Sequence, residues 1–386
     1  EDAGMLSRFY TDICATKGFP KYIKGAFPQS LAPPSLRSLF DRVPHGIPID
    51  KIQAFTVFGL QRAIRQRMRS SLSEQTRDYI WAGQRFGALV SPQMTHDLDA
   101  VYTFKTAALE ILETCRRLGV FTIVEQPNVH RRIMHDILRK EHQRYTKWEE
   151  LRENDKHLAQ EVERERREWD LADLIICPSE FVQRGVELGD GPVNRTVVVP
   201  YGVDFPARSL PRSAPERPLH ILTVGSVSLR KGAPYLLQAA QRSQAHFRAV
   251  GSMGLRPYGK KKLEQHVDVT GRVPRSEIHQ QYEWADIFLL PSLCEGSATV
   301  VYEAMAYALP IICTPNTGSI IRDGKEGYLI PVRDADTIVD RLETLSSNPE
   351  LYTNMSRNAL QRYCNAGSLT AYADRLVSAI QNALVK

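Results

Sequence analysis

The segment 285–310, ADIFLLPSLCEGSATVVYEAMAYALP, predicts a buried strand that passes through a turn into a helix. Residues 287–290 form an apolar run with the length of a buried strand, and Pro291 ends it. Gly296-Ser297 supplies a turn and a helix N-cap, and residues 298–308 have helical composition. In open α/β sheets, ligands bind at such a junction, at the carboxyl end of a strand.

Two glutamates, Glu295 and Glu303, lie eight positions apart on the two sides of this junction. Glu303 has apolar neighbours in the helix, where a carboxylate is costly unless hydrogen-bonded, and a ligand with several hydroxyls would supply the bonds. The helix N-terminus between the two acids offers free N–H groups and a positive dipole end, which suit a phosphate. This arrangement suggests a sugar nucleotide. The alternative, a loop glutamate and a salt-bridged helix glutamate, is not excluded by the spacing alone.

The length of the chain, 386 residues, fits two domains of roughly 150–200 residues each. An internal repeat supports this, since residues 172–179 and 285–292 both contain Ala-Asp, four apolar residues and Pro-Ser. The simplest account is two doubly wound α/β domains with corresponding strands. Chance is the alternative, because buried parallel strands all look alike. We place the first domain at residues 1–200 and the second at 201–368, with a polar, proline-rich connection over residues 200–218.

Apolar runs predict strands at residues 6–11, 54–58, 101–104, 121–124, 174–177, 197–199, 219–224 and 287–290. A long charged helix is predicted over residues 146–170, because apolar residues recur there on one helical face. That face consists of Trp148, Leu151, Leu158, Val162 and Trp169. A final helix, within residues 369–386, has an apolar face that must dock elsewhere, on the crevice edge or on the first domain.

The six cysteines are scattered without CxxC or zinc-ligand spacing, which indicates a reducing compartment such as the cytoplasm. No apolar run approaches the ~20 residues of a membrane span.

Charge is uneven along the chain. Residues 1–147 contain 22 lysines and arginines against 14 acids, and a basic cluster in one predicted helix consists of Arg62, Arg65, Arg67 and Arg69. Such a surface would meet anionic lipid headgroups or an acidic acceptor, which predicts peripheral contact with a membrane. A solvated basic face without a partner is the alternative. Nucleic acid is not expected, because no recognised binding motif accompanies the charge.

The loop 225–232, GSVSLRKG, follows the first predicted strand of the second domain. A glycine-containing turn with adjacent Arg230 and Lys231 that opens a helix is a plausible cradle for a diphosphate, although a solvated basic turn is the alternative. The loop is no Walker A motif, because GxxxxGK[ST] is absent.

Seven motifs together point to a known family. They are VPYGVD (199–204), VGSVSLRKG (224–232), AVGSMG (249–254), TGRVP (270–274), ADIFLLPSLCEG (285–296), VVYEAMAYALPIICT (300–314) and DGKEGYLIP (323–331). From about residue 171 to residue 357 the chain resembles glycosyltransferase family 4, retaining enzymes of the GT-B fold. The resemblance implies two Rossmann-like domains that face a crevice.

The resemblance also implies roles for single residues. Lys231 would contact the donor diphosphate, Glu295 would hold hydroxyls of the transferred sugar, and Glu303 would bind the ribose hydroxyls. Further donor contacts would come from the N–H groups at Gly296, Ser297, Ala298 and Thr299, and from the base pocket formed by Arg272, Val273 and Pro274.

The chain departs from the family pattern at several positions. Ser226 stands where the family usually has arginine, and we expect Arg230 to substitute for it. Ser297-Ala298 replaces an aromatic-glycine pair, which leaves the sugar preference open. His130 or Glu125 is a candidate for a histidine that touches the donor sugar in many relatives, and a structural histidine is the alternative. We also expect about 20–40 further residues upstream, the length of one strand–helix unit.

The resulting expectation is a retaining glycosyltransferase that moves a sugar from a UDP- or GDP-sugar to an acceptor hydroxyl, without a cofactor. The acceptor would be a lipid-linked saccharide, a polysaccharide or a small molecule. Metal independence is expected, because lysine and the helix dipole would neutralise the phosphates. The DxD patterns at residues 97–99 and 334–336 are interpreted as solvated loop acids. The alternatives are a nucleotide-sugar-binding module without catalysis, or another GT-B enzyme such as an epimerase or a phosphorylase.

Overall fold

The computed structural model describes residues 1–18, 20–22, 40, 42–68, 71–150, 155–216 and 218–385. Arg69 of the predicted basic cluster and Leu151 of the predicted helix face lie outside the described residues. The chain divides into two compact units, Glu1–Val124 with Asn154–Asp173 and Glu125–Glu153 with Leu174–Lys386. The domain ranges inferred from the sequence, with a boundary at residue 200, stay a prediction.

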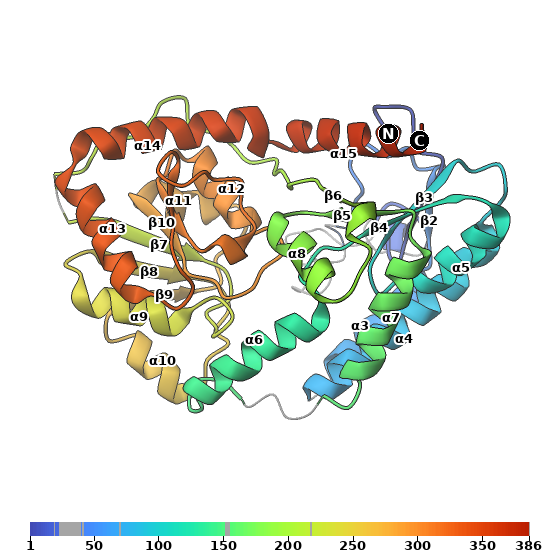
Figure 1. Cartoon of the computed structure of the whole chain (residues 1–386), viewed down its shortest axis with the longest axis horizontal. Coiled ribbons are helices and arrows are strands. Elements are labelled where there is room, and N and C mark those ends of the chain that lie inside the picture. Colours follow the sequence, from blue (N-terminus) through green and yellow to red (C-terminus); the bar gives the residue numbers. More distant parts are fainter. Residues whose placement is uncertain are drawn as a thin grey trace. The chain divides into compact units, whose positions relative to one another are not determined.

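A parallel six-stranded sheet organises the second unit (Figure 1). Its strands are β7 (His220–Val224), β8 (His246–Val250), β9 (Val267–Gly271), β10 (Ile287–Leu290), β11 (Ile311–Cys313) and β12 (Gly327–Leu329). They lie in the order β12-β11-β10-β7-β8-β9, and all neighbouring strands are parallel. The chain therefore starts at β7, continues outward to β9, and returns to β10 on the other side of β7. This reversal creates a topological switch point between β7 and β10.

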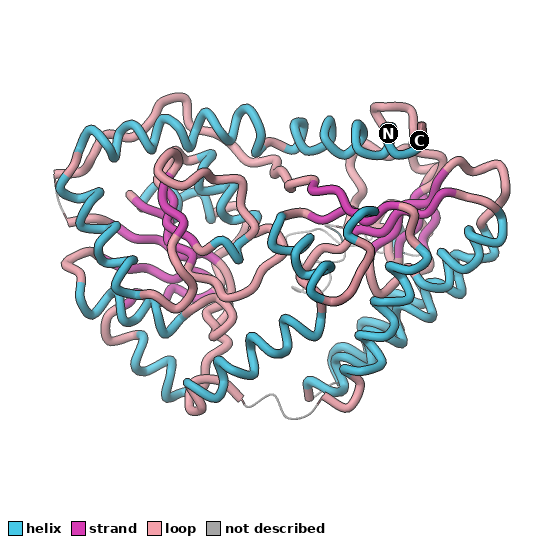
Figure 2. Tube along the Cα trace, viewed as in Figure 1, coloured by secondary structure: helices cyan, strands magenta, loops and turns pink. Residues whose placement is uncertain are grey.

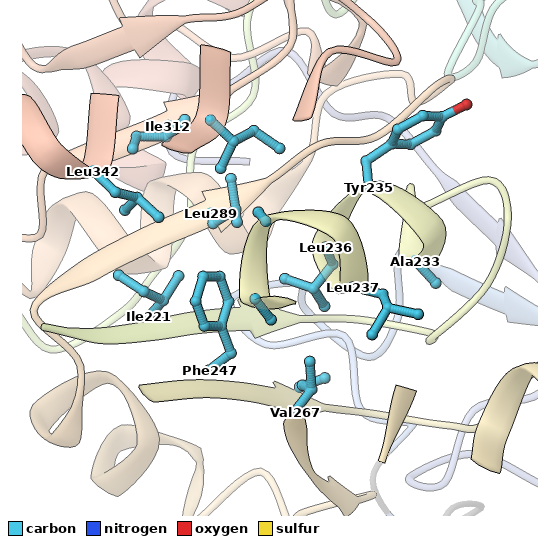
Figure 3. Close-up of a cluster of buried hydrophobic side chains, with 14 of the residues drawn as sticks. Ile221, Ala233, Tyr235, Leu236, Leu237, Phe247, Val267, Leu289, Ile312 and Leu342 are labelled. Carbon is cyan, nitrogen blue, oxygen red and sulfur yellow. The ribbon is translucent and has the colours of Figure 1, made fainter. Parts of the chain in front are cut away.

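Helices cover both faces of this sheet, because successive strand residues point to opposite sides. On one face, Ile221, Phe247 and Leu289 form a buried cluster with Leu236 and Leu342 (Figure 3). The helices that contribute to this cluster include α9 (Ala233–Arg242), α10 (Pro257–Leu263) and α13 (Ala335–Ser347).

On the other face, Leu222 and Phe288 pack with Tyr282 and Tyr302. These tyrosines come from α11 (Ile278–Trp284) and α12 (Thr299–Ala306). Two separate apolar layers of this kind hold the sheet rigid, so the loops at its carboxyl edge have fixed anchors.

The second unit also contains chain from before β7. Helices α6 (Arg131–Arg144) and α8 (Glu180–Leu188) belong to it, as do strands β5 (Leu174–Cys177) and β6 (Thr196–Val198), which pair in parallel. The predicted strand at residues 174–177 is confirmed with the same bounds as β5.

The helix predicted near the C-terminus is confirmed as α15 (Leu369–Leu384), which follows α14 (Pro349–Arg362) after a π-helical turn at Tyr363–Gly367. None of its residues, all of which the structure describes, is buried, and it contacts the connection that precedes β7 through Tyr372 and Arg375. Tyr372 packs edge-on against Tyr201, with ring centroids 5.6 Å apart, and the Arg375 guanidinium donates to the carbonyl oxygen of Pro200 at 2.8 Å.

The first unit is rich in helix (Figure 2). It contains α3 (Thr56–Met68), α4 (Leu72–Val90), α5 (Leu109–Leu118) and α7 (Leu158–Leu171), with β1 (Phe9–Thr11), β2 (Ile52–Ala54), β3 (Ala100–Phe104) and most of β4 (Phe121–Glu125). Strands β1 and β2 form a parallel pair. The strand predicted at residues 54–58 is wrong except at Ala54, because β2 ends there and α3 begins at Thr56 and buries Phe58.

The long helix predicted over residues 146–170 is also wrong in its first half. Helix α7 begins at Leu158, whereas Trp148 lies in a turn and joins the buried cluster of the second unit. A Cβ at Gly259 of α10 would lie only 3.1 Å from the Trp148 ring, so the glycine allows this close packing. Trp169 is buried in α7, which belongs to the first unit. The helical spacing of the two tryptophans was therefore coincidental.

Among the described residues, we find no helix that combines the length and the hydropathy needed to span a membrane.

Candidate active site

Two loops lie together at the switch point of the six-stranded sheet. Loop 225–232 follows β7 and loop 291–298 follows β10, and these neighbouring strands both end at this edge. The backbone N–H of Leu293 donates to the carbonyl oxygen of Arg230 at 2.8 Å, which ties one loop to the other. Gly232 has φ +77°, and a Cβ there would overlap the carbonyl oxygen of Pro291, so only glycine fits this contact.

The two loops bring together the side chains that the sequence singled out. Each carboxylate oxygen of Glu295 forms an ion pair. One oxygen lies 2.7 Å from the Arg230 guanidinium, and the other lies 2.8 Å from the Lys231 ammonium. Arg230 also donates to the carbonyl oxygen of Cys294 at 3.0 Å. The three side chains therefore form one cluster with two positive charges and one negative charge.

Burial strengthens the electrostatic interactions that this cluster makes. The side chains of Lys231 and Glu295 are each only 10% exposed. Burial lowers the pKa of Lys231, an effect that outweighs the opposite influence of Glu295. In such a poorly solvated place, the surplus positive charge attracts an anion more strongly than it would in water. The cluster is thus suited to bind a phosphate or a diphosphate.

Glycines open the space around the lysine. Gly225, Gly251 and Gly271 stand at the ends of β7, β8 and β9, and all have positive φ. A Cβ at Gly225 would lie 3.1 Å from Cε of Lys231, and one at Gly251 would overlap the carbonyl oxygen of Gly225. The ends of β7 and β8 therefore approach each other more closely than a side chain at Gly251 would permit.

Glu303 lies in the middle of α12, with its side chain 3% exposed. The hydroxyl of Tyr282 donates to one carboxylate oxygen at 2.7 Å, and Arg275 pairs with the other at 2.8 Å. Burial and the nearby Glu303 carboxylate raise the pKa of Tyr282 well above its usual range, so the phenol remains a donor. The expectation that a ligand must supply the bonds to Glu303 is therefore incomplete, because the protein supplies two of them.

The N-terminus of α12 differs in detail from the expectation. The N-cap residue is Ala298, not Ser297, and the Ser297 hydroxyl bonds instead to the Tyr302 hydroxyl at 2.8 Å. No side chain among the described residues caps this helix start. The N–H of Ala298 donates to the carbonyl oxygen of Thr317 at 2.9 Å, so it is already engaged and is not a free donor for a ligand.

Gly296 lies where three chain segments meet. A Cβ there would overlap the carbonyl oxygen of Pro127, and the hydroxyl of Ser179 donates to the Gly296 carbonyl oxygen at 2.6 Å. The segment that contains Pro127 also contains His130, which is buried, with its ring against Gly189. The nearby Glu125 accepts a hydrogen bond from Tyr201, and its pKa is raised by burial.

The remaining predicted donor-binding residues surround these clusters. Ser226 lies within hydrogen-bond distance of Ser228, with 3.5 Å between their hydroxyl oxygens. Arg272 and Pro274 are exposed in the loop after β9, and Val273 packs partly against the apolar layer that contains Tyr302. Whether these residues contact a donor stays a prediction.

One further acid, which sequence reasoning missed, holds the basic loop. Glu149 accepts a hydrogen bond from the backbone N–H of Leu229, the residue before Arg230, and also lies 3.4 Å from Nε2 of His142. Eighty positions separate Glu149 from the loop, and Glu149 was placed in a helix that does not form there, so no local signal pointed to this contact.

Within the described residues, no group of three or more His, Cys, Asp or Glu side chains is arranged to hold a metal ion. Of the second DxD pattern, Asp334 caps α13 by accepting from the N–H of Thr337 at 2.9 Å, and Asp336 pairs with Arg242.

Comparison with known sequences agrees with this geometry. Residues 209–362 match the model of the family described as glycosyl transferases group 1. An uncharacterized glycosyltransferase of Haemophilus influenzae is 34% identical over 148 residues, which cover 35% of this chain and 42% of that protein. The putative colanic acid biosynthesis glycosyltransferase WcaL of Salmonella typhimurium is 29% identical over 195 residues, 45% of this chain and 48% of that protein. The chain thus spans less than half the length of these curated relatives.

A solved structure matches over a longer range. Anabaena Alr3699/HepE in complex with UDP-glucose aligns with a TM-score of 0.60 over 97% of this chain and 98% of that chain, at 16% identity. The likeness shows that the α/β fold with parallel sheets is the GT-B fold, as predicted.

Proposed function

We propose that the chain is a retaining glycosyltransferase, because residues 209–362 match the model of the glycosyl transferases group 1 family. It moves a sugar from a nucleoside-diphosphate donor, a UDP- or GDP-sugar, to an acceptor hydroxyl. The observation that carries this proposal is the buried cluster of Arg230, Lys231 and Glu295 at the switch point. One acid cannot neutralise two cations, so the cluster favours an anionic ligand there.

The cations act on the leaving group. When the bond between the anomeric carbon and the diphosphate oxygen breaks, negative charge grows on that oxygen. Lys231 and Arg230 are already in place to stabilise this charge, because Glu295 and the carbonyl oxygen of Cys294 hold them. Such preorganised electrostatic stabilisation is commonly the largest single contribution to catalysis.

The two glutamates orient the donor. Glu295 lies beside the predicted diphosphate site and would accept hydrogen bonds from hydroxyls of the transferred sugar, which fixes the reacting carbon. Glu303 would accept from the ribose hydroxyls through the lone pairs that Tyr282 and Arg275 leave open, since an ionised carboxylate has about four acceptor positions. Residues 272–274 would border the base.

In this proposal the anomeric configuration is retained, because the acceptor attacks the anomeric carbon on the same face from which the diphosphate leaves. The acceptor oxygen bonds to the anomeric carbon, and its proton passes to the departing phosphate oxygen. No protein nucleophile takes part. Charge neutralisation by Lys231 and Arg230 replaces a metal ion and no cofactor is used, so a chelator should leave turnover unchanged. Loss of turnover on chelation, restored by a divalent cation, would contradict this step.

The acceptor in this proposal is a lipid-linked saccharide, a polysaccharide or a small molecule with a free hydroxyl. The name of the relative WcaL, which refers to colanic acid biosynthesis, makes saccharide acceptors the first class to assay. The reaction is placed in the cytoplasm, which fractionation of cells that express the chain would check.

The test combines binding and turnover. A thermal-shift screen of nucleotide sugars, beginning with UDP-glucose because HepE was solved with it, should find one donor that raises the melting temperature. That donor should then be consumed only with an acceptor, and NMR should show an unchanged anomeric configuration in the product. Binding without transfer would instead indicate a binding module, conversion without acceptor an epimerase, and dependence on inorganic phosphate a phosphorylase.

A further inference from the structure

Helix α3 of the first unit presents an apolar stripe to solvent. Val57, Leu60, Ile64 and Met68 are 71%, 45%, 59% and 78% exposed. Their spacing of three, four and four residues puts all four on one side of the helix. Single exposed apolar residues are ordinary, but four in a row on one face are not, and such patches mark surfaces that bind a partner.

The opposite side of α3 is anchored, so the stripe lies on a fixed element. Phe58 and Gly59 are buried. The Phe58 ring packs against Trp81 with centroids 5.9 Å apart, and a Cβ at Gly59 would overlap the side chain of Ile13. The exposed stripe is therefore the outward side of a packed helix and not the result of a loose end.

The charges around the stripe are mostly positive. Helix α3 contains Arg62, Arg65 and Arg67 and no acid. At about 100° per residue, Arg65 lies about 100° to one side of Ile64 in the stripe, and Arg67 about 60° to the other side. Arg62 pairs with Asp12 at 3.0 Å, and Arg65 pairs with Asp78 at 3.4 Å.

Two further arginines share these acids, so the surroundings keep a surplus of positive charge. Arg42 also pairs with Asp12, and Arg77 also lies near Asp78. Among the described residues, α3 and the ion pairs with Asp12 and Asp78 together contain five arginines and two acids.

We propose that α3 docks the protein on an anionic lipid surface. The helix lies parallel to the membrane plane, the stripe of Val57, Leu60, Ile64 and Met68 enters the boundary between headgroups and acyl chains, and the flanking arginines reach lipid phosphates. Arginine is suited to this position, because its apolar stem can follow the stripe while its guanidinium stays at headgroup level. A protein partner of ordinary composition would need acids placed to match both arginine flanks, whereas an anionic membrane offers phosphates on every side.

This inference does not depend on the proposed glycosyl transfer, because it concerns binding alone. The full chain is sedimented with vesicles of two parts phosphatidylcholine to one part phosphatidylglycerol, and with vesicles of phosphatidylcholine alone. We expect binding to the anionic vesicles and much weaker binding to the neutral ones. The bound fraction should fall with added salt, since surface charges are screened.

Matched variants then locate the surface. The double variant Leu60→Ser/Ile64→Ser should lower the partition coefficient on the order of tenfold or more, because two inserted apolar side chains are lost. Arg67→Glu should lower it roughly fivefold or more. Gln66→Ser, exposed on the same helix but outside the stripe, should bind as the unchanged protein does. All these sites are exposed, and a thermal unfolding curve for each variant checks that the fold is retained.

Three results would overturn the proposal. The unchanged protein fails to bind anionic vesicles, or it binds neutral vesicles equally well, or the folded Leu60→Ser/Ile64→Ser variant binds as strongly as the unchanged protein. A concentration-dependent dimer without lipid that this double variant abolishes would assign the stripe to a second copy of the chain instead. Sedimentation equilibrium of the same samples measures that outcome.

Discussion

Glu295 and Glu303 are both buried acids in one short segment of the chain, yet their surroundings differ in kind. Glu295 lies between two cations, Arg230 and Lys231, in a loop at the sheet edge. Glu303 lies inside a helix, where a buried phenol donates to one of its oxygens and a largely exposed arginine pairs with the other.

The difference indicates which part of a ligand each place can take. Around Glu295 the positive charge exceeds the negative charge, so a bound anion would bring the local net charge closer to zero. Around Glu303 one arginine already balances one carboxylate, so an added anion gains nothing, whereas a neutral hydroxyl donor can still use the open lone pairs. The two environments together match a molecule with a charged diphosphate and neutral sugar hydroxyls.

The largest expected effect is on the charged side of this comparison. Lys231→Met keeps the apolar stem but removes the ammonium that would stabilise the leaving diphosphate. We expect kcat to fall about 10²- to 10³-fold, the usual loss for one preorganised electrostatic contact. The matched control is Lys260→Met on α10, whose side chain is 49% exposed and which should keep full activity. Steady-state kinetics with a fixed acceptor measures both, and equal activity of the two variants would remove Lys231 from the mechanism.

The second prediction distinguishes Glu303 from Glu295 by the ligand whose binding depends on it. Glu303→Gln keeps the shape of the side chain but removes its charge, so hydrogen bonds to ribose hydroxyls weaken. The dissociation constant of the nucleotide sugar should rise about tenfold to a hundredfold, while that of inorganic pyrophosphate should hardly change. Calorimetry with both ligands tests this, with the exposed Glu277→Gln as control. A parallel loss of pyrophosphate binding would mean that Glu303 acts on the diphosphate after all.

The third prediction concerns pH. Burial lowers the pKa of Lys231 below the 10.5 of an ordinary lysine, so its ammonium is lost earlier as pH rises. Donor affinity should therefore weaken on the alkaline side before free lysines titrate, and Lys231→Arg should move this weakening to higher pH, since arginine stays charged. In the same window the unfolded chain holds the proton that the folded chain has lost. The free energy of unfolding should thus rise with pH relative to Lys231→Met. A donor affinity that does not change up to pH 10 would contradict the lowered pKa of Lys231.

The smallest effects are expected around Glu303 in the ligand-free protein. Arg275 is 72% exposed, so Arg275→Ala should change the free energy of unfolding by less than about 1 kcal/mol. Tyr282 is fully buried, so Tyr282→Phe should cost about 1–3 kcal/mol, because one carboxylate oxygen loses its donor. Urea unfolding measures both. If Arg275→Ala is the more costly of the two, the ion pair stabilises Glu303 more than the phenol does.

Much of the second unit could be predicted from the sequence, because its strands are apolar runs with sharp ends. Strand β10 at Ile287–Leu290 has the predicted bounds, and α12 begins within one residue of the expected place. The first unit could be predicted less well. Residues 146–170 have apolar side chains at helical spacing throughout, yet Trp148 and Trp169 belong to different cores. Spacing along the chain does not say which core a side chain joins.

In the site, the sequence indicated the acids and the basic loop but not their partners. Arg230 and Lys231 were predicted beside a diphosphate, and the structure adds that Glu295 holds both. Tyr282 and Glu149 were missed, because each reaches its partner from a segment 21 or 80 positions away in the chain. Hydrogen bonds between distant segments leave no local pattern in the sequence.

The central claim is that the cluster of Arg230, Lys231 and Glu295 binds the diphosphate of the donor. Its most direct test is calorimetric titration of UDP and UMP, or of GDP and GMP if guanine proves to be the base, into the unchanged protein and into Lys231→Met. We predict that the unchanged protein binds the diphosphate far more tightly than the monophosphate, and that this preference largely disappears in the variant. A preference of the same size in both proteins would contradict the account.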